Sequence, residues 1–136
     1  MSGALETLAA LVTQLGNEGD AAVAAELRWH FIGHLQRNKV KLVAPLVTCW
    51  QTVDSVRLGV EIAHRLGSEI ISADSRQVYR GLDLGTGKDL EEYSAVSPPI
   101  PYHLIDVADP GEVYSLFSYQ RDCYAVLRAK NQEKRF

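Results

Sequence analysis

The chain has 136 residues, 46% of them hydrophobic and 23% charged, which is the composition of an ordinary soluble globular protein and predicts a single domain over residues 1–136. Its formal net charge of −3 offers no overall attraction to nucleic acid, so any contact with RNA requires a local basic patch. The sequence has no apolar run of membrane-spanning length and no basic region followed by an apolar core near its N-terminus, which predicts a cytoplasmic protein without a membrane partner.

Residues 1–27 are predicted to form a helical N-terminal segment without functional residues. It begins with an apolar stripe at amphipathic-helix spacing, made of Leu5, Leu8, Val12 and Leu15. Residues 16–20 break this helix. The alanine-rich run that follows is predicted to be helical again, with Asp20 as a candidate cap.

A strand–helix–strand unit is predicted over residues 46–73. Its first strand, residues 46–53, is followed by a helix that opens near Ser55 and ends before Gly67, which stands where a C-terminal glycine belongs. The predicted apolar face of this helix consists of Leu58, Ile62 and Leu66. Residues 69–73 are short, apolar and β-branched at the centre, which predicts a buried strand. Because such connections are right-handed crossovers, the two strands are predicted to be parallel.

The remaining chain completes an α/β pattern. Residues 97–101 are rich in proline and predict an extended connector, residues 102–107 predict another strand, and residues 115–130 predict a final amphipathic helix. The side chains of this helix that are predicted to face inward are Leu116, Tyr119, Cys123, Val126 and Leu127. Together these elements predict an α/β fold with a small, mostly parallel sheet of three or four strands flanked by helices.

Four polar residues directly follow the predicted strand 69–73, namely Asp74, Ser75, Arg76 and Gln77. Open α/β sheets bind ligands at the carboxyl ends of their parallel strands, so this group of carboxylate, hydroxyl, guanidinium and amide is a candidate ligand site. The alternative is that Asp74 or Ser75 caps the next helix, and the residues alone leave both interpretations open.

The stretch 71–79 closely resembles the signature of the tRNA dimethylallyltransferase family. The resemblance continues through three further blocks, residues 81–88, 101–107 and 119–122. It spans about residues 63–127, so residues 66–130 are interpreted as a transferase-like fragment.

This resemblance implies transfer of a prenyl group from dimethylallyl diphosphate to the exocyclic amine of an adenosine in a tRNA anticodon loop, with Mg²⁺ as the family's cofactor. It implies that Asp74 accepts a proton from the amine, and that Asp74, Ser75, Arg76 and Gln77 contact the tRNA. A carboxylate suits this step because the adenine amine is a poor nucleophile, and RNA loops are read by side chains that hold splayed bases.

The phosphate-binding half of that reaction has no counterpart in the sequence. The family places a glycine-rich loop ending in Gly-Lys-Ser or Gly-Lys-Thr where residues 53–55 read Val-Asp-Ser. Residues 85–88, Gly-Thr-Gly-Lys, fail the Walker pattern because Leu82 and Asp89 occupy its first-glycine and hydroxyl positions, and they are interpreted as a connector. The chain is therefore predicted to be an incomplete P-loop-kinase-like unit that is inactive alone and binds tRNA weakly.

Residues 28–65 carry a second resemblance, through the run Trp-His-Phe-Ile-Gly-His-Leu-Gln at residues 29–36. This run is similar to a barrel segment of the pyridoxal-phosphate homeostasis family, which implies pyridoxal phosphate as the cofactor in this alternative. The family's cofactor-lysine segment has no match, so Lys39 and Lys41 receive no role and no Schiff base is expected. The two resemblances meet near residues 63–66, which indicates a fusion or rearrangement of two fragments.

Three functional classes stay open: a transferase-like fragment, a cofactor-binding module, and a rearranged α/β domain without activity. The oligomeric state is open as well. His30 and His34 are interpreted as structural or surface histidines rather than metal ligands, since no carboxylate lies in their block. Tyr114, Tyr119 and Arg121 could contact RNA, but aromatic residues at helical spacing are more often core residues.

Overall fold

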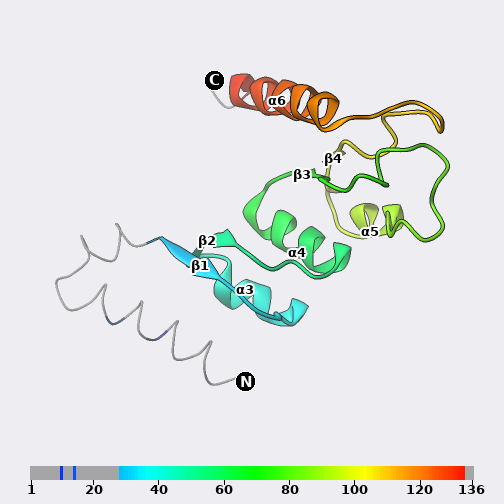
Figure 1. Cartoon of the computed structure of the whole chain (residues 1–136). Helices are drawn as coiled ribbons and strands as arrows, with labels where there is room; N and C mark the ends of the chain where they lie inside the picture. Colours follow the sequence, from blue (N-terminus) through cyan, green and yellow to red (C-terminus); the bar gives the residue numbers. More distant parts are fainter. Residues whose placement is uncertain (1–9, 11–13, 15–27, 134–136) are drawn as a thin grey trace. The chain divides into compact units, whose positions relative to one another are not determined.

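A computed structural model describes residues 10, 14 and 28–133, so the helices predicted within residues 1–27 lie almost entirely outside the described residues. The chain divides into two compact units, Met1–Ser68 and Glu69–Phe136. The elements of the first unit are β1 (Trp29–Phe31), the 3-10 helix η1 (Arg37–Lys39), α3 (Val40–Val43), β2 (Val47–Trp50) and α4 (Val56–Leu66) (Figure 1). Those of the second unit are β3 (Ile70–Ile71), α5 (Leu90–Ser94), β4 (Tyr102–His103) and α6 (Leu116–Glu133). Within the described ranges, none of these helices combines the length and the apolar character that a membrane span needs.

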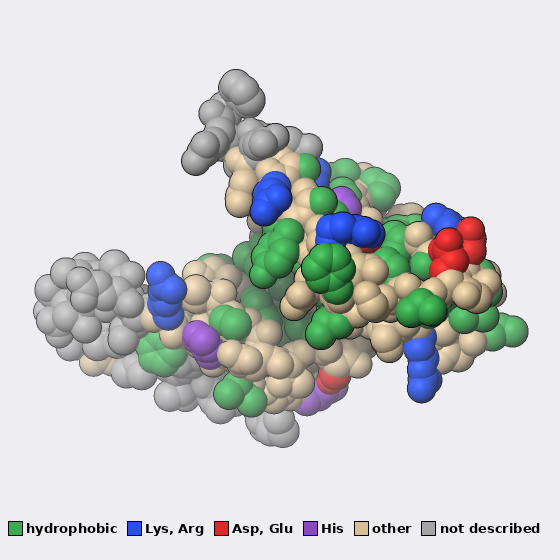
Figure 2. Space-filling view, turned by 45° about the horizontal axis from the view of Figure 1, so that its top comes forward, with side chains coloured by type: hydrophobic (Ala, Val, Ile, Leu, Met, Phe, Trp, Pro, Cys, Tyr) green, Lys and Arg blue, Asp and Glu red, His purple; other side chains and the backbone are tan. Residues whose placement is uncertain are grey.

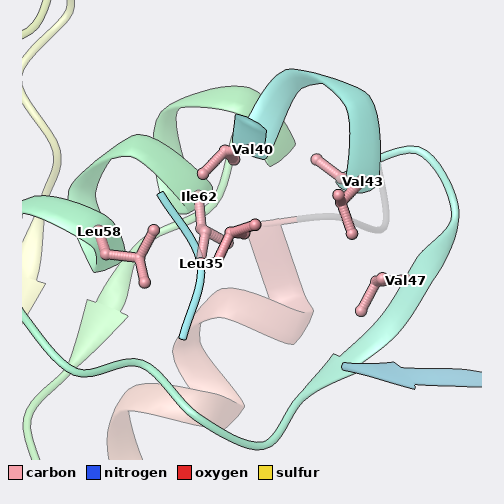
Figure 3. Close-up of a cluster of buried hydrophobic side chains, with 7 residues drawn as sticks. Leu35, Val40, Val43, Val47, Leu58 and Ile62 are labelled. Atoms are coloured by element: carbon pink, nitrogen blue, oxygen red, sulfur yellow. The ribbon is translucent and has the colours of Figure 1, made fainter. Parts of the chain in front are cut away.

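The first unit is built on a parallel pair of strands. β1 and β2 run in the same direction, and η1 and α3 lie between them along the chain (Figure 1). β2, α3, α4 and the neighbouring connections contribute to one cluster of buried side chains, made of Leu35, Val40, Val43, Ala44, Val47, Leu58 and Ile62 (Figure 3). Phe31 and Trp50 pack against this cluster with ring centroids 5.7 Å apart. Burial of these side chains stabilises the unit, by about 1.5–3 kcal/mol for each large apolar side chain.

Both ends of α4 lie where the sequence predicts them. Ser55 is the N-cap, and its Oγ accepts a hydrogen bond from the amide of Leu58 at 3.3 Å. Gly67 follows the last turn in the left-handed conformation, with φ +58°. Its amide and that of Ser68 donate to carbonyls of the last turn, which satisfies acceptors that a helix end leaves open.

The apolar face of α4 differs from the predicted one at its C-terminal end. Leu58 and Ile62 are buried, whereas Leu66 is 49% exposed. Val60 and Ala63 are buried instead. Leu66 is the last residue of the helix, where the chain turns away, so helical spacing alone does not place it in the core.

Replacing Gly67 with alanine is expected to lower the free energy of unfolding of the first unit by about 1 kcal/mol, because a side chain in the left-handed region strains the backbone. An added Cβ meets no atom within 4 Å, so the loss reports the backbone alone. Urea denaturation followed by the fluorescence of Trp29 and Trp50, both in this unit, gives the measurement. Gly67→Asn is the control and should lose less, since asparagine tolerates this conformation. An alanine variant as stable as the parent would contradict the cap assignment.

The second unit is built on another parallel pair, β3 with β4, in which Ile70 lies opposite Tyr102. The α/β class and the parallel arrangement predicted from the sequence are confirmed. The four strands of the described residues form two separate parallel pairs, whereas the sequence predicts one small sheet of three or four strands. The amide of Ile70 donates to the carbonyl of Pro101 and that of Ser72 to His103, and these bonds engage β3 with β4.

β4 is shorter than the strand predicted over residues 102–107. The chain leaves the extended conformation after His103, because Leu104 and Asp106 have φ values of +63° and +57°. Residues other than glycine rarely adopt this region, and they persist there only when their surroundings hold them. Leu104 is buried in the unit, and Asp106 forms an ion pair with Lys88.

The last helix, α6, exposes much of the apolar face that was predicted to point inward. Leu116 and Leu127 are 73% and 44% exposed, and Phe117 and Tyr124 are also exposed. The three remaining residues of the predicted face are half-buried, namely Tyr119, Cys123 and Val126. Figure 2 shows hydrophobic side chains at the surface next to lysine and arginine side chains. The spacing correctly predicts an amphipathic helix, but the described part of the chain covers only part of its apolar stripe.

Candidate functional site

The residues after β3 form a turn that is held by the carboxylate of Asp74. Its Oδ1 accepts hydrogen bonds from the backbone amides of Arg76 at 2.7 Å and Gln77 at 3.2 Å. The amide of Asp74 itself donates to Ser72 Oγ at 3.4 Å. This is the Asx-type turn that aspartate favours, in which a side-chain oxygen replaces a backbone acceptor. Asp74 therefore caps a turn and not the next helix, α5, which begins at Leu90.

The turn presents three polar side chains to solvent. Asp74, Ser75 and Arg76 are all exposed. Within the described residues, Asp74 Oδ2 has no hydrogen-bond partner and the Arg76 guanidinium has no carboxylate partner. A carboxylate fixed by backbone amides thus lies next to a hydroxyl and a guanidinium that are open to a ligand.

Gln77 differs from these neighbours because its side chain is half-buried and bonded at both ends. Its Nε2 donates to the carbonyls of Thr86 at 3.1 Å and Gly87 at 3.0 Å. Its Oε1 accepts a hydrogen bond from Ser72 Oγ at 2.8 Å. The carboxamide thereby joins the end of β3 to the glycine-rich loop 85–88.

Lys88 is the only charged residue among those described that is buried, with 2% of its side chain exposed. Its Nζ donates to Asp106 Oδ1 at 2.5 Å, to Asp83 Oδ1 at 2.8 Å and to the carbonyl of Tyr79 at 2.8 Å. Burial lowers the pKa of this ammonium, but the hydrogen bonds and charges of Asp106 and Asp83 outweigh burial and raise the pKa above its ordinary value. Lys88 is therefore protonated at neutral pH, and its three protons are all engaged.

The sequence pattern of residues 85–88 does not indicate this ion-pair centre, because it bears on Lys88 only as a phosphate ligand. A lysine needs an anionic partner where it is buried, and Asp83, five residues before Lys88, is a carboxylate close to it in the sequence. With its ammonium engaged inside the unit, Lys88 supports the interpretation of residues 85–88 as a connector.

The first unit carries its own polar side chains around the ends of β1 and β2. His34 Nδ1 lies 2.5 Å from Asp54 Oδ2, and His30 Nδ1 lies 2.9 Å from Gln51 Nε2. Both histidines are exposed, and they have different partners. In residues 28–133 no three side chains of the metal-ligating types come together. Asp54 is paired with His34.

The aromatic residues that were considered as RNA contacts stabilise the start of α6. Tyr114 and Tyr119 are half-buried, and the hydroxyl of Tyr114 donates to Asp122 Oδ2 at 2.9 Å. Burial and this hydrogen bond raise the pKa of Tyr114 to about 12. Arg121 is exposed but also binds Asp122, at 2.7 Å. Their contacts therefore favour a structural role over a role in RNA binding.

Glu69 links the start of the second unit to β4 and α6. Its carboxylate oxygens lie 2.6 Å from His103 Nε2 and 3.0 Å from Lys130 Nζ. The hydrogen bonds from His103 and Lys130 lower the pKa of Glu69 below its ordinary value of 4.5, against the opposing effect of burial. The stabilisation by Glu69 is therefore complete above pH 4.5 and is lost as the pH falls through the lowered pKa of the folded state.

This linkage predicts how acid affects the second unit. Near-ultraviolet circular dichroism of the tyrosines should show that the free energy of unfolding of the parent falls below pH 4.5. Glu69→Gln should be less stable at neutral pH, and its free energy of unfolding should depend less on pH in the acid range. Tryptophan fluorescence, recorded in the same samples, follows the first unit separately. The same pH dependence of the free energy of unfolding in both proteins would show that ionised Glu69 does not stabilise the second unit.

Comparison with known proteins relates the second unit to one family. Residues 77–136 match the family model described as IPP transferase. A tRNA dimethylallyltransferase 2 of Bacteroides fragilis is 67% identical over 72 residues, which make up 51% of this chain and 24% of that protein. A tRNA dimethylallyltransferase 1 of Porphyromonas gingivalis is 54% identical over 80 residues, 57% of this chain and 26% of the relative. A tRNA dimethylallyltransferase 1 of Geotalea uraniireducens is 63% identical over 65 residues, which cover 48% of this chain and 20% of that protein.

The chain spans about a quarter or less of the length of these curated relatives. No solved structure matches it. The C-terminal part of the chain is thus similar to IPP transferases, as its motifs predict. The resemblance of residues 28–65 to the pyridoxal-phosphate homeostasis family stays a prediction, and so does a fusion of two fragments.

Proposed function

We propose that the chain carries the tRNA-facing part of a tRNA dimethylallyltransferase. The family reaction transfers a prenyl group from dimethylallyl diphosphate to the exocyclic amine of an adenosine in a tRNA anticodon loop. The observation that carries the proposal is the turn after β3, where two backbone amides hold the exposed carboxylate of Asp74 beside Ser75 and Arg76. The family match over residues 77–136 supports it.

In this proposal Asp74 is the base. The lone pair of the adenine amine is delocalised into the ring, so the amine attacks well only if a base accepts its proton as the new N–C bond forms. The amine proton passes to the Asp74 carboxylate, and the electron pair of the broken C–O bond leaves with the diphosphate. Because Oδ1 is held by the amides of Arg76 and Gln77, Oδ2 is the oxygen available to accept the proton.

Ser75 and Arg76 are the proposed RNA contacts beside the base. A guanidinium stacks on a splayed base or forms paired hydrogen bonds with a phosphate, and Arg76 is exposed to do either. Gln77 is the fourth contact that the resemblance implies. Its amide protons are both bonded inside the unit, which sets it apart from the other three.

Mg²⁺ and pyridoxal phosphate are the cofactors that the two resemblances imply. Mg²⁺ usually binds one or two carboxylates together with substrate phosphates and water, and in the described part the carboxylates of Asp83 and Asp106 are both engaged by Lys88. A Schiff base with pyridoxal phosphate needs an unprotonated amine, whereas Lys88 is held protonated and Lys130 is paired with Glu69. No step of the proposed reaction is therefore assigned to either group.

Binding of an anticodon stem-loop is expected to be weak and to depend on Arg76, because the chain is net acidic and this guanidinium is open beside the base. Fluorescence anisotropy at low salt should show Arg76→Ala binding about five- to tenfold more weakly than the parent, as expected for loss of one specific arginine contact. Arg128→Ala, which removes another exposed arginine in α6, is the matched control and should bind like the parent. Equal binding by the parent and Arg76→Ala would remove the support for an RNA contact here.

A further inference from the structure

Gln77 has no hydrogen-bond donor left for an RNA base. Its Nε2 carries two protons, and both are donated within the unit, to the carbonyls of Thr86 and Gly87. These carbonyls also fix which end of the carboxamide is the nitrogen, since a flipped amide would set its oxygen against two acceptors. The oxygen end accepts a hydrogen bond from the hydroxyl of Ser72. Donating to a base from this side chain, as the paired recognition of adenine by an amide requires, would break bonds that the unit already makes.

The same residue holds the Asp74 turn at three points. The Gln77 amide donates to Asp74 Oδ1 at 3.2 Å, and the Gln77 carbonyl accepts from the amide of Asp106 at 3.0 Å. The side chain binds Ser72 Oγ, which in turn accepts the amide of Asp74. The backbone on both sides of the Asp74 carboxylate is therefore connected through Gln77.

Lys88 anchors the loop that Gln77 binds. It follows directly after Gly87, and its Nζ is bonded to the carbonyl of Tyr79 and to Asp106. The Gln77 carboxamide and the Lys88 ammonium both connect the turn after β3 to the glycine-rich loop 85–88, the first through the loop carbonyls and the second through the carbonyl of Tyr79. The Asp106 amide adds a bond to the backbone carbonyl of Gln77. The left-handed backbone of Asp106, with φ +57°, needs such support to persist.

We propose that Gln77 is a positioning residue that fixes the Asp74 carboxylate through the loop ending at Lys88, and that Gln77 does not contact tRNA. The role of Asp74 in this statement rests on the proposed function. The bracing of the turn does not depend on it, because it follows from the hydrogen bonds of the unit alone.

Amide hydrogen exchange of the full chain, followed residue by residue by NMR, tests the proposal. In Gln77→Leu, the amides of Arg76 and of position 77 should exchange about tenfold faster or more, because the turn loses its brace. The amides of Ile70 and Ser72, which bind β4 and its flank, should keep their rates. Gln120→Leu, at an exposed position of α6, is the matched control and should change neither. Binding of the anticodon stem-loop is measured on the same proteins.

The outcomes separate bracing from contact. Weaker stem-loop binding by Gln77→Leu with unchanged exchange at Arg76 would make Gln77 a direct contact and overturn the proposal. Faster exchange at Arg76, together with equal stem-loop binding by the parent and Arg76→Ala, would support the bracing while the proposed function fails. If the amides of Ile70 and Ser72 also exchange faster in Gln77→Leu, the change has affected more than the turn, and Gln77→Glu is measured instead. Glutamate keeps the shape of the glutamine side chain but lacks its two N–H donors. Unchanged exchange at Arg76 in that variant would overturn the proposal, and faster exchange would support it.

Discussion

Replacement of Lys88 with methionine is expected to lower the free energy of unfolding of the second unit by about 3 kcal/mol. Methionine fills a similar volume, so the loss comes mainly from the carboxylates of Asp83 and Asp106, which then face each other without their shared cation. Removing one partner of a buried ion pair costs about 3–5 kcal/mol, and the lower end applies because Asp83 is 68% exposed and partly screened by water. Asp106, at 33% exposure and with a strained backbone, is expected to account for most of the effect.

The distribution of tryptophan provides a separate probe for this measurement. Trp29 and Trp50 are the only tryptophans of the chain and both belong to the first unit, so their fluorescence follows the unfolding of that unit by itself. Tyrosine circular dichroism or amide exchange at Ile70 reports the second unit. Adding Asp106→Asn to Lys88→Met should recover part of the loss, because it removes one of the two uncompensated charges. Surface substitutions usually change the free energy of unfolding by less than about 0.5 kcal/mol. A change no larger than this in Lys88→Met would contradict the assignment of Lys88, Asp83 and Asp106 as a stabilising ion-pair centre.

The chain on its own is expected to transfer no prenyl group to tRNA. In the proposed function Asp74 supplies only the base, which is typically worth about 10²- to 10⁴-fold in rate. Stabilising the charge of the departing diphosphate is usually the larger electrostatic contribution, and it needs cations or amides aimed at the phosphates. Here the lysine after the glycine-rich loop, Lys88, has its ammonium engaged by two carboxylates, and the resemblance implies that Asp54 stands where the family has its phosphate loop.

Incubation of the purified chain with radiolabelled dimethylallyl diphosphate, magnesium and unmodified tRNA gives the test. The label in the tRNA should not exceed the level found without enzyme. An active full-length tRNA dimethylallyltransferase, assayed in parallel, shows that the same substrates can react. Label above that level which disappears in Asp74→Asn would show that the chain is an enzyme and that the phosphate-binding half is supplied by other residues. Label that persists in Asp74→Asn would indicate a contaminating activity, and the prediction for the chain would stand.

Features that depend on neighbouring residues are the ones that could be predicted from the sequence. The ends of α4 follow from Ser55 and Gly67, because a cap forms hydrogen bonds within one turn of its own helix. The location of the candidate site follows from the polar residues after β3. The motifs after Asp74 also predicted the family similarity that the comparison found over residues 77–136.

Strand pairing and strand length required the tertiary structure. The residues of β3 carry no mark that distinguishes β2 from β4 as a partner, because parallel pairing uses backbone groups that every strand offers. β4 stops at His103 because Leu104 and Asp106 adopt left-handed conformations, and Asp106 is paired with Lys88, which lies 18 residues away in the chain. The spacing of α6 likewise predicts an apolar stripe but does not tell how much of it another element covers.

The sequence by itself determined which residues could do chemistry, and the tertiary structure decided which of them are free to do it. Asp74 and Arg76 keep their side chains at the surface of a turn, so the roles that their residue types suggest stay open to them. Gln77 and Lys88 are equally polar in sequence, but their donors are consumed by partners between 5 and 18 residues away in the chain. A buried donor must be bonded and a buried charge must be paired, and which partners meet that demand depends on contacts that only the folded chain brings together.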